Sequence, residues 1–178
     1  MRKLANVELN RLSIDDYKKT EKISLSVILD NIRSLNNIGS IFRTCDAFLV
    51  EKLYLCGITA CPPHKDIHKT ALGATESVAW EYYDNTLKVL SILKSEDYII
   101  LSAEQTDNSL FLQDIKLDKK NKYAIIFGHE VRGVDQAVIE KCDGCIEIPQ
   151  HGTKHSLNVS VSAGIVIWEM FKQINNQK

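Results

Sequence analysis

The stretch SLSVILDNIRSLNNIGSIFRTCDAF, residues 24–48, contains the strand and the helix that decide the fold class. Its first part, Ser24–Leu29, is a short apolar run of the kind that predicts a β-strand. From Asn37 to Phe48, apolar residues recur at spacings of three and four, which is the pattern of one face of an amphipathic helix. We therefore expect a strand, a polar connection and a helix in succession.

The same alternation continues through the rest of the chain. More strands are predicted at Lys52–Cys56, Val78–Tyr83, Tyr98–Leu101, Tyr123–Phe127 and Cys145–Ile148. Further helices are predicted at Thr86–Leu93, Asp135–Lys141 and Leu157–Ile174. Alternating strands and helices are typical of an α/β fold, so we predict a mainly parallel six-stranded sheet with helices on both faces.

The length and composition fit one globular domain. The chain has 178 residues, of which 44% are apolar and 25% are charged, and this balance argues against disorder. We expect a single domain over residues 1–178, with a helical extension over about residues 1–22 in which Ser13 and Asp16 form a variant capping box. No apolar run is long enough to cross a bilayer, and MRKLANVELN lacks the apolar core of a signal peptide. We therefore expect a cytoplasmic protein without membrane contact.

The net charge of −1 lacks the excess of positive charge that dedicated nucleic-acid binders have. Any contact with nucleic acid must therefore be local. Basic candidates gather near the N-terminus, at Arg2, Lys3, Arg11, Lys18, Lys19 and Lys22. Solvated charges on a helix surface are the simpler interpretation of these residues.

The five cysteines, an odd number without a regular framework, favour reduced thiols over disulfides. Two short segments, Cys56–Cys61 and Cys142–Cys145, have cysteine spacings that could hold zinc. Small, half-buried residues are the better interpretation of these cysteines. His64 and His68 are predicted to lie in a loop, and no sequence feature places them beside the thiols. We therefore expect no metal site.

Four of the eight glycines, Gly128, Gly133, Gly144 and Gly152, lie between the fifth predicted strand and the last helix. Glycine is used where the backbone turns sharply or approaches a ligand closely, so this region is a good candidate for ligand binding. The first strand-to-helix connection contains only Gly39 and has neither a G-x-G-x-x-G pattern nor a P-loop. A Rossmann dinucleotide site is therefore disfavoured.

Three polar segments each follow a predicted strand: DNIRSLNNIGSIFR after the first, GHEVRG after the fifth and QHGTKHSLN after the sixth. In parallel sheets, the loops that leave the carboxyl ends of the strands gather in one crevice, where ligands bind. Residues distant in sequence could meet there, namely Asn37, Arg43, Glu130, Ser156 and Asn158. Some have simpler interpretations, such as a helix cap for Asn37 or an ion pair between Arg43 and Asp46. The coincidence of three segments favours a site.

Three separated motifs carry a resemblance that covers most of the chain, from about Ser24 to Phe171. They are LDNIRSLNNIGSIFRTCDAF (residues 29–48), IIFGHEVRGV (residues 125–134) and IEIPQHGTKHSLNVSVSAGIVIWEM (residues 146–170). In this order the motifs resemble the SpoU, or TrmH, branch of the SPOUT RNA methyltransferases. The chain departs from the family pattern at Leu35, where proline is common, and at Leu49, where glycine is common. Both are structural positions and bear on loop geometry more than on activity.

The resemblance implies a C-terminal trefoil knot formed by the glycine-rich region, with S-adenosylmethionine bound in the knot. By the same resemblance, the residues that bind the cofactor are Ala103, Gly128, Ile148, Gln150 and Leu157, with Ser156 close by. It also implies a homodimer whose active site takes residues from both subunits. The last predicted helix, Leu157–Ile174, is apolar nearly all round, which independently favours cover by a partner subunit or a central place in the core.

The implied activity is transfer of a methyl group from S-adenosylmethionine to a ribose 2′-hydroxyl of tRNA or rRNA. Such a hydroxyl needs a group that orients it and draws away its proton. The resemblance points to Arg43, either as a base in an unusual setting or as a clamp for a phosphate and the developing alkoxide. Asn37, Glu130, Ser156 and Asn158 would position the reactants. Alternatives are a non-catalytic RNA-binding module of the same fold and a nucleotide-dependent α/β enzyme unrelated to RNA.

Overall fold

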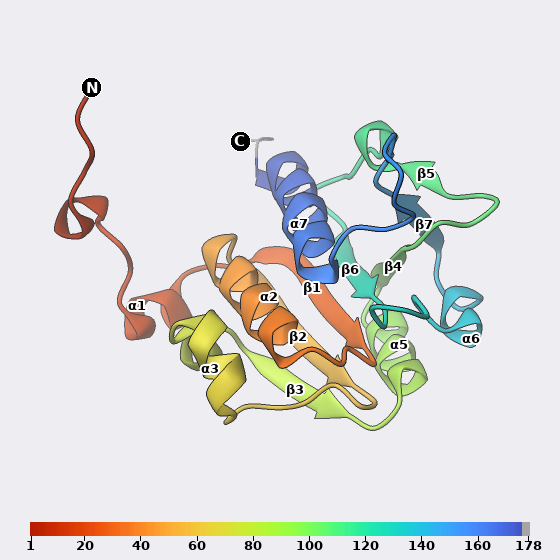
Figure 1. Cartoon of the computed structure of the whole chain (residues 1–178), viewed down its shortest axis with the longest axis horizontal. Coiled ribbons are helices and arrows are strands. Elements are labelled where there is room, and N and C mark those ends of the chain that lie inside the picture. The colour runs from red at the N-terminus through yellow and green to blue at the C-terminus, as the bar shows by residue number, and fades with distance from the viewer. Residues whose placement is uncertain (176–178) are drawn as a thin grey trace.

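The computed structural model describes residues 1–175 and contains a sheet with helices on both faces (Figure 1). The strands are β1 (Ile23–Asp30), β2 (Val50–Cys56), β3 (Trp80–Tyr83), β4 (Tyr98–Ala103), β5 (Leu110–Phe111), β6 (Lys122–Phe127) and β7 (Gly144–Glu147). The helices are α1 (Ile14–Lys19), α2 (Leu35–Ala47), α3 (Lys65–Ala71), α4 (Ala74–Ser77), α5 (Thr86–Ser95), α6 (Gln136–Ile139) and α7 (Val159–Asn175), with 3-10 turns at Asn6–Leu9 and Leu112–Asp114. In the described part of the chain, no helix combines the length and the apolar character that crossing a membrane requires.

The seven strands form one sheet in the order β3-β2-β1-β6-β4-β7-β5, and all neighbouring pairs are parallel. The predicted α/β class and parallel sheet are therefore confirmed. The predicted number of six strands is wrong, because β5 is an additional strand that pairs with β7 at the edge of the sheet. Its two residues are exposed and are too few to show a period in the sequence.

The segment after β2 is helical where the sequence predicts a loop. His64 caps α3, since its Nδ1 accepts a hydrogen bond from the N–H of Asp66 at 3.2 Å, and His68 lies within the helix. The prediction of a loop for these histidines is therefore wrong. The buried residues of α3 are Ile67 and Ala71. Two apolar positions on one turn are too few to reveal an amphipathic helix.

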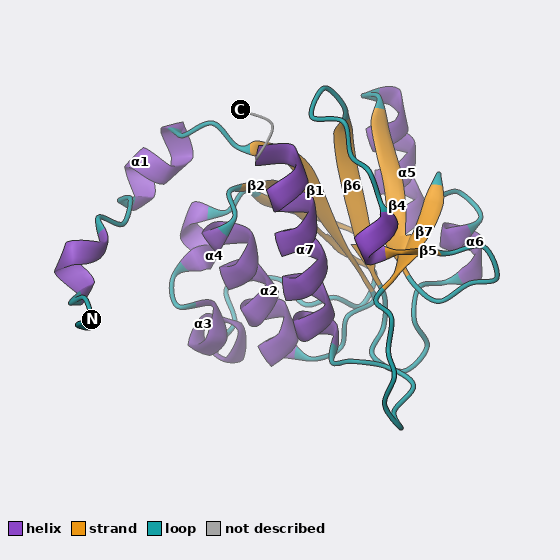
Figure 2. Ribbon diagram, turned by 90° about the horizontal axis from the view of Figure 1, so that it is seen from above, coloured by secondary structure: helices purple, strands orange, loops and turns teal. Residues whose placement is uncertain are grey.

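The central strand β1 is buried over almost its entire length, which is why it reads as a continuous apolar run. Its side chains alternate between two cores. Leu25, Val27 and Leu29 pack in the core that includes residues of α2 and α7, and Ile28 packs in the core that includes residues of α5. Figure 2 shows these layers, with α2, α3, α4 and α7 on one face of the sheet and α5 and α6 on the other.

Helix α2 begins at Leu35, earlier than the predicted start at Asn37. Its cap is Ser34, whose Oγ accepts a hydrogen bond from the N–H of Asn37 at 3.4 Å. Asn37 is therefore inside the helix, and its interpretation as the cap is wrong. The predicted cap of α1 is confirmed, since Ser13 Oγ accepts a hydrogen bond from the N–H of Asp16 at 3.1 Å.

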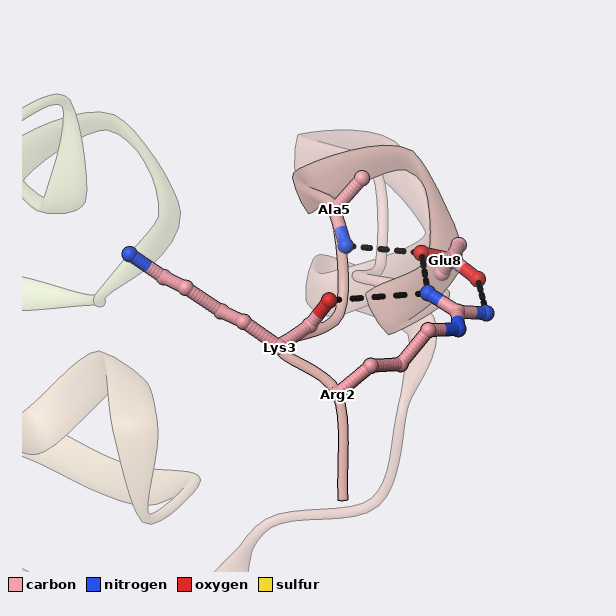
Figure 3. A network of polar contacts seen from close by, with 4 residues as sticks. All are labelled: Arg2, Lys3, Ala5 and Glu8. Carbon is pink, nitrogen blue, oxygen red and sulfur yellow. Dashed lines mark hydrogen bonds and ion pairs between the residues drawn. The ribbon is translucent and has the colours of Figure 1, made fainter.

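The N-terminal segment extends away from the rest of the molecule (Figures 1 and 2). Within it, the Glu8 carboxylate accepts hydrogen bonds from the Arg2 guanidinium, at 2.5 and 2.9 Å, and from the N–H of Ala5, at 2.7 Å (Figure 3). The charge of Arg2 is therefore paired within the chain. The segment joins the body at α1, whose buried Tyr17 belongs to the main core.

Candidate functional site

A hydrogen-bonded network lies beyond the carboxyl ends of β1 and β6. These strands are adjacent, and Leu29 of β1 lies opposite Phe127 of β6. The loops that follow them therefore leave the sheet at the same level. Glu130, in the loop after β6, accepts hydrogen bonds from the backbone N–H groups of Arg33 at 3.0 Å and of Ser34 at 2.9 Å. One carboxylate thus joins the loop after β6 to the loop that enters α2.

Two asparagines extend the network to the last helix. The side-chain amide of Asn37 donates to Glu130 Oε1 at 3.1 Å, and its carbonyl oxygen accepts from Asn158 Nδ2 at 3.2 Å. Asn158 Oδ1 in turn accepts from the N–H of Ser160 at 2.9 Å, near the start of α7. The structure therefore brings together Asn37, Glu130 and Asn158, which come from the three polar segments that follow strands in the sequence.

The hydrogen bonds set the charge state of Glu130. Partial burial raises the pKa of its carboxyl group, but donation from the N–H groups of Arg33 and Ser34 and from the Asn37 amide outweighs burial. The pKa of Glu130 therefore lies below its ordinary value. At neutral pH the group is a carboxylate that accepts hydrogen bonds from all of its neighbours in the network.

A cavity of about 260 Å³ adjoins the network and shares Glu130 with it. Its walls come from the ends of β4, β6 and β7 and from the segment that leads into α7. It is lined by all of the residues expected to bind the cofactor, Ala103, Gly128, Ile148, Gln150 and Leu157, and by Ser156. Their common place at one cavity is observed, and their roles stay predictions.

Glu104 also lines the cavity, and the sequence patterns do not single it out. Its carboxylate accepts hydrogen bonds from the N–H groups of Val134 and Gln105, each at 3.0 Å. Gly133 has a φ of +70°, and a Cβ atom there would lie 2.1 Å from the Glu104 carboxylate. A Cβ atom at Gly128 would lie 2.2 Å from the backbone of Gly133. The one sequence signal for Glu104 is its position directly after the end of β4.

The segment between β7 and α7 forms one wall of the cavity. In the part of the chain that the structure describes, residues 149–157 make no hydrogen bond, either with their backbone or with their side chains. Gln150, His155, Ser156 and Leu157 of this segment line the cavity. Backbone N–H and C=O groups require partners when they are covered, so this wall offers unpaired donors and acceptors to a ligand.

Arg43 lies outside the cavity. Its exposed side chain lines a separate hollow between α2 and α3, together with Lys69. The alternative interpretation, an ion pair with Asp46, is not observed within residues 1–175, where Asp46 Oδ1 accepts a hydrogen bond from Ser77 Oγ at 2.5 Å. No ion pair within residues 1–175 involves Arg43. The predicted meeting of Arg43 with the other polar residues is therefore not observed within one chain.

The cysteines are free thiols in the structure. Cys142 donates a hydrogen bond to the C=O of Val138 at 3.3 Å, and Cys145 Sγ lies 2.9 Å from Ser102 Oγ. Burial raises the pKa of Cys142 to about 12, so this group is a neutral thiol at neutral pH. Within residues 1–175, the side chains of His, Cys, Asp and Glu form no group of three that could hold a metal ion.

The fold and the site define an α/β protein that has a cavity and a polar network at the carboxyl ends of a parallel sheet. A comparison with models of protein families identifies its family. The chain belongs to the SpoU rRNA Methylase family, whose model matches residues 24–168. The matched range contains Asn37, Glu130 and Asn158. The family membership that the three motifs predict is therefore confirmed.

One relative with a longer chain is similar in sequence, and one solved structure is similar in fold. A TrmH family protein of Staphylococcus haemolyticus, named as a tRNA/rRNA methyltransferase, is 32% identical over 160 residues. The match covers 90% of this chain and 63% of that relative, so the chain spans less than two thirds of its length. The solved TrmH/SpoU tRNA modifying enzyme of A. aeolicus has a TM-score of 0.81 and 27% identity, with 92% of this chain and 83% of that chain covered.

Two further solved structures share the fold at 22% identity. AviRb from Streptomyces viridochromogenes, in complex with the cofactor AdoMet, has a TM-score of 0.78 and covers 89% of this chain and 63% of its own. An RNA 2′-O ribose methyltransferase has a TM-score of 0.76, with 86% of this chain and 57% of that chain covered. At this identity the likeness concerns the fold.

Proposed function

We propose that this chain is an S-adenosylmethionine-dependent methyltransferase that modifies a ribose 2′-hydroxyl of tRNA or rRNA. The observation that carries the proposal is the network of Asn37, Glu130 and Asn158 beside the cavity. Membership of the SpoU family supports the same activity. A relative named as a tRNA/rRNA methyltransferase and a solved RNA 2′-O ribose methyltransferase with this fold support the substrate class.

The chemistry of the cavity fits S-adenosylmethionine, the cofactor with which AviRb was crystallised. Half-buried Ile148 offers apolar surface for an adenine ring, and the buried Phe127 and Ile146 lie behind the cavity wall. The unpaired peptide groups of residues 149–157 supply donors and acceptors for the polar parts of the molecule. We assign cofactor binding to Ala103, Gly128, Ile148, Gln150 and Leu157. When bound, this cofactor supplies an electrophilic methyl group on a sulfonium centre.

The path of the chain around the cavity supports a trefoil knot. After β7, which lies near one edge of the sheet, residues 148–158 lead to α7, which packs against α2 and β1. The segment therefore passes β4 and β6, beside the turn of residues 128–133. Such a path is what a C-terminal segment threaded through a loop requires, and threaded chains are rare among protein folds.

Arg43 is assigned the binding of an RNA phosphate and the stabilisation of the negative charge that develops on the ribose oxygen. A guanidinium stays protonated in proteins and presents its N–H donors in a fixed fork, which suits both tasks better than the role of a base. The exposed Arg43 has no ion-pair partner among the described residues. Its charge is therefore available to a substrate.

Asn37, Glu130 and Asn158 are assigned a positioning role, because their hydrogen bonds tie α2, the loop after β6 and the start of α7 together. Ser156, which lines the cavity, is assigned a contact with the cofactor or the ribose. Alignment of donor and acceptor contributes much of the rate of such reactions, on the order of 7–11 kcal/mol in well-oriented systems. A network of this kind keeps the cavity and α2 in one arrangement.

A homodimer would join the two parts of the site, because Arg43 and the cavity lie apart in one chain. The exposed face of α7 supports this assembly. Val161, Ile165 and Trp168 lie on one stripe of the helix and are 50%, 38% and 46% exposed. The Trp168 ring packs 5.4 Å from that of Phe48, at the end of α2, so the apolar stripe lies beside the helix that carries Arg43.

The remaining parts of the proposal concern organisation and location. Residues 1–178 form a single methyltransferase domain with an extension over about residues 1–22. The protein acts in the cytoplasm, where RNA substrates are present and where free thiols such as its five cysteines persist.

The test of the function measures cofactor binding and methyl transfer separately. In Arg43→Ala, binding of S-adenosylmethionine by calorimetry stays near the wild-type value, because Arg43 is assigned to the RNA and is not among the residues that line the cofactor cavity. Transfer of labelled methyl groups to unmodified total tRNA and rRNA falls by about 10²–10³-fold, as for the loss of one donor to a developing oxyanion. Arg2→Ala is the matched control and retains transfer, because Glu8 already pairs that arginine.

Full activity of Arg43→Ala would remove Arg43 from the mechanism. A wild-type protein that binds RNA but not S-adenosylmethionine would instead be a non-catalytic RNA-binding module. A protein that retains a different nucleotide on purification and transfers no methyl group to RNA would be an enzyme of another class.

A further inference from the structure

The hollow between α2 and α3 is a second polar feature of the surface, separate from the cavity. Its polar lining consists of Ser40, Arg43 and Thr44 from α2 and of Lys69 and Thr70 from α3. We call these five residues the α2–α3 hollow. Among residues 1–175, no carboxylate belongs to its lining. Figure 2 shows the two helices side by side on the same face of the sheet.

Close packing of the two helices fixes the position of Lys69 relative to Arg43. A Cβ atom at Gly39 would lie 2.1 Å from Thr70 Oγ1 and 2.3 Å from the carbonyl oxygen of Ile67, so α3 approaches α2 where only glycine fits. Thr70 Oγ1 also donates a hydrogen bond across the two helices, to the C=O of Asn36 at 3.1 Å. The residue before Thr70 is therefore held beside the helix that carries Arg43.

The two cations of the hollow, Arg43 and Lys69, are exposed and form no ion pair within residues 1–175. Some exposed cations have carboxylate partners, for example Lys88 with Asp84 at 2.8 Å, and others, such as Lys141, form no ion pair within residues 1–175. Two unpaired positive charges in one hollow, without a carboxylate, favour an anionic ligand.

The hydroxyl groups of the hollow add a second chemical preference. Ser40 Oγ donates to the C=O of Asn36 at 2.8 Å, and Thr44 Oγ1 donates to the C=O of Ser40 at 3.1 Å. Because these hydroxyl hydrogens and that of Thr70 are used by helix carbonyls, the oxygens can only accept further hydrogen bonds. A ribose 2′-hydroxyl is a donor of the required kind, and it distinguishes RNA from DNA.

We propose that Lys69 is an RNA-binding residue that holds a backbone phosphate of the substrate next to the nucleotide engaged by Arg43. The inference rests on the proposed function and deepens it, because it extends the RNA surface from α2 to α3. Lysine acts there as a point charge, so an arginine at the same position can replace it in binding a phosphate. Lys69 positions the RNA and takes no part in the chemical step.

The experiment measures the dissociation constant for unmodified total tRNA and total rRNA at several salt concentrations. Lys69→Ala binds RNA several-fold more weakly, and its slope of log affinity against log salt is smaller by roughly 0.7–0.9, the value for one lost phosphate contact. Its KM for RNA rises while kcat changes little. Lys69→Arg restores affinity and slope. Lys141→Ala, an exposed lysine outside the hollow at the end of α6, behaves as wild type.

An unchanged affinity and salt slope in Lys69→Ala, with a wild type that methylates RNA, would overturn the assignment of Lys69 and leave the proposed function intact. A weaker affinity that Lys69→Arg does not restore would also overturn it, since the effect would then be structural. A wild type that neither binds S-adenosylmethionine nor methylates RNA would overturn the proposed function and, with it, the role of Lys69. Unfolding curves of each variant confirm that the exposed substitutions leave the fold unchanged.

Discussion

At the scale of single residues, Glu130 shows how one carboxylate sets the geometry of a site. Its oxygens accept hydrogen bonds from the backbone of Arg33 and Ser34 and from the side chain of Asn37. All of these donors are neutral, so the group keeps its charge without an ion pair. The N–H groups of Arg33 and Ser34 lie at the entrance of α2, outside its own hydrogen-bonded turns, so the Glu130 carboxylate supplies the acceptor that they need.

Glu130→Ala is expected to lower the free energy of unfolding by about 2 kcal/mol, because two part-buried donors and one exposed donor lose a charged acceptor. Denaturant unfolding measures this difference. Glu140→Ala is the matched control, since the Glu140 carboxylate accepts only a 3.3 Å hydrogen bond from Gln136 on the surface of α6. Equal stability of Glu130→Ala and Glu140→Ala would contradict a structural role for the network.

The difference in unfolding free energy between wild type and Glu130→Ala is expected to depend on pH. The pKa of Glu130 in the folded protein lies below its ordinary value of 4.5. Its ionised form therefore contributes stability that is fully present above pH 4.5 and is lost as the pH falls through the lowered pKa. The difference in unfolding free energy between wild type and Glu130→Ala should be constant near neutral pH and shrink below pH 4.5. A difference that grows on acidification would contradict the predicted direction of the pH dependence.

At the scale of elements, helix α2 explains both departures from the family pattern. Leu35 is the first residue of the helix after its cap, a position where proline is favoured because its fixed φ suits the helix start. Leu49 has a φ of +53°, in the left-handed region that glycine adopts without strain. Leucine at both positions packs partly against the main core. At each end of α2, the apolar contacts of the leucine side chain offset a backbone position that proline or glycine would fit better.

Gly39→Ala tests the contact between α2 and α3. Alanine favours a helix over glycine by about 1 kcal/mol, yet the new Cβ would lie 2.3 Å from a backbone oxygen of Ile67. We expect a net loss of about 1–3 kcal/mol in the free energy of unfolding from overpacking. Gly152→Ala, where a Cβ meets nothing within 4 Å, should leave the midpoint of denaturation near that of wild type. A stabilised Gly39→Ala would show that the helices do not pack closely.

At the scale of the whole molecule, the α2–α3 hollow and the cavity lie on separate parts of the surface. The exposed apolar stripe of α7 lies close to elements that belong to each of them. The stripe contacts the end of α2 through Trp168 and Phe48. Leu157, just before α7, lines the cavity. A partner chain seated on this stripe would therefore lie near both parts of the site. The proposed homodimer could therefore form a shared active site, although Arg43 lies outside the cavity of its own chain.

Ile165→Lys is expected to convert a dimer into monomers without unfolding them. Ile165 is 38% exposed, so a lysine can extend into solvent in a single chain but would bury a charge against a partner helix. Sedimentation or light scattering measures the mass, and cofactor binding and methyl transfer are followed in the same samples. Ile165→Leu keeps the apolar surface and should keep the wild-type mass. A monomeric and fully active wild type would exclude the shared site.

Local patterns in the sequence determined the α/β class and the strand and helix of residues 24–48, and the resemblance of three motifs to the SpoU family implied Ala103, Gly128, Ile148, Gln150 and Leu157, which line the cavity. Apolar periodicity depends only on near neighbours in the chain, so Ile23–Asp30 and Leu35–Ala47 can be read directly, to within a few residues. Elements with too few apolar positions escape this reading. β5 and α3 are the examples, since each buries two residues or fewer.

Only the tertiary structure decided which distant residues touch. The strand order places β6 beside β1, so Glu130 reaches the N–H groups at the start of α2, and it leaves Arg43 away from the cavity. The close approach of two helices at Gly39 puts Lys69 next to Arg43. These contacts depend on how the layers pack across the sheet. Sequence periodicity reflects only near neighbours in the chain, so it cannot predict contacts between residues that are far apart in sequence.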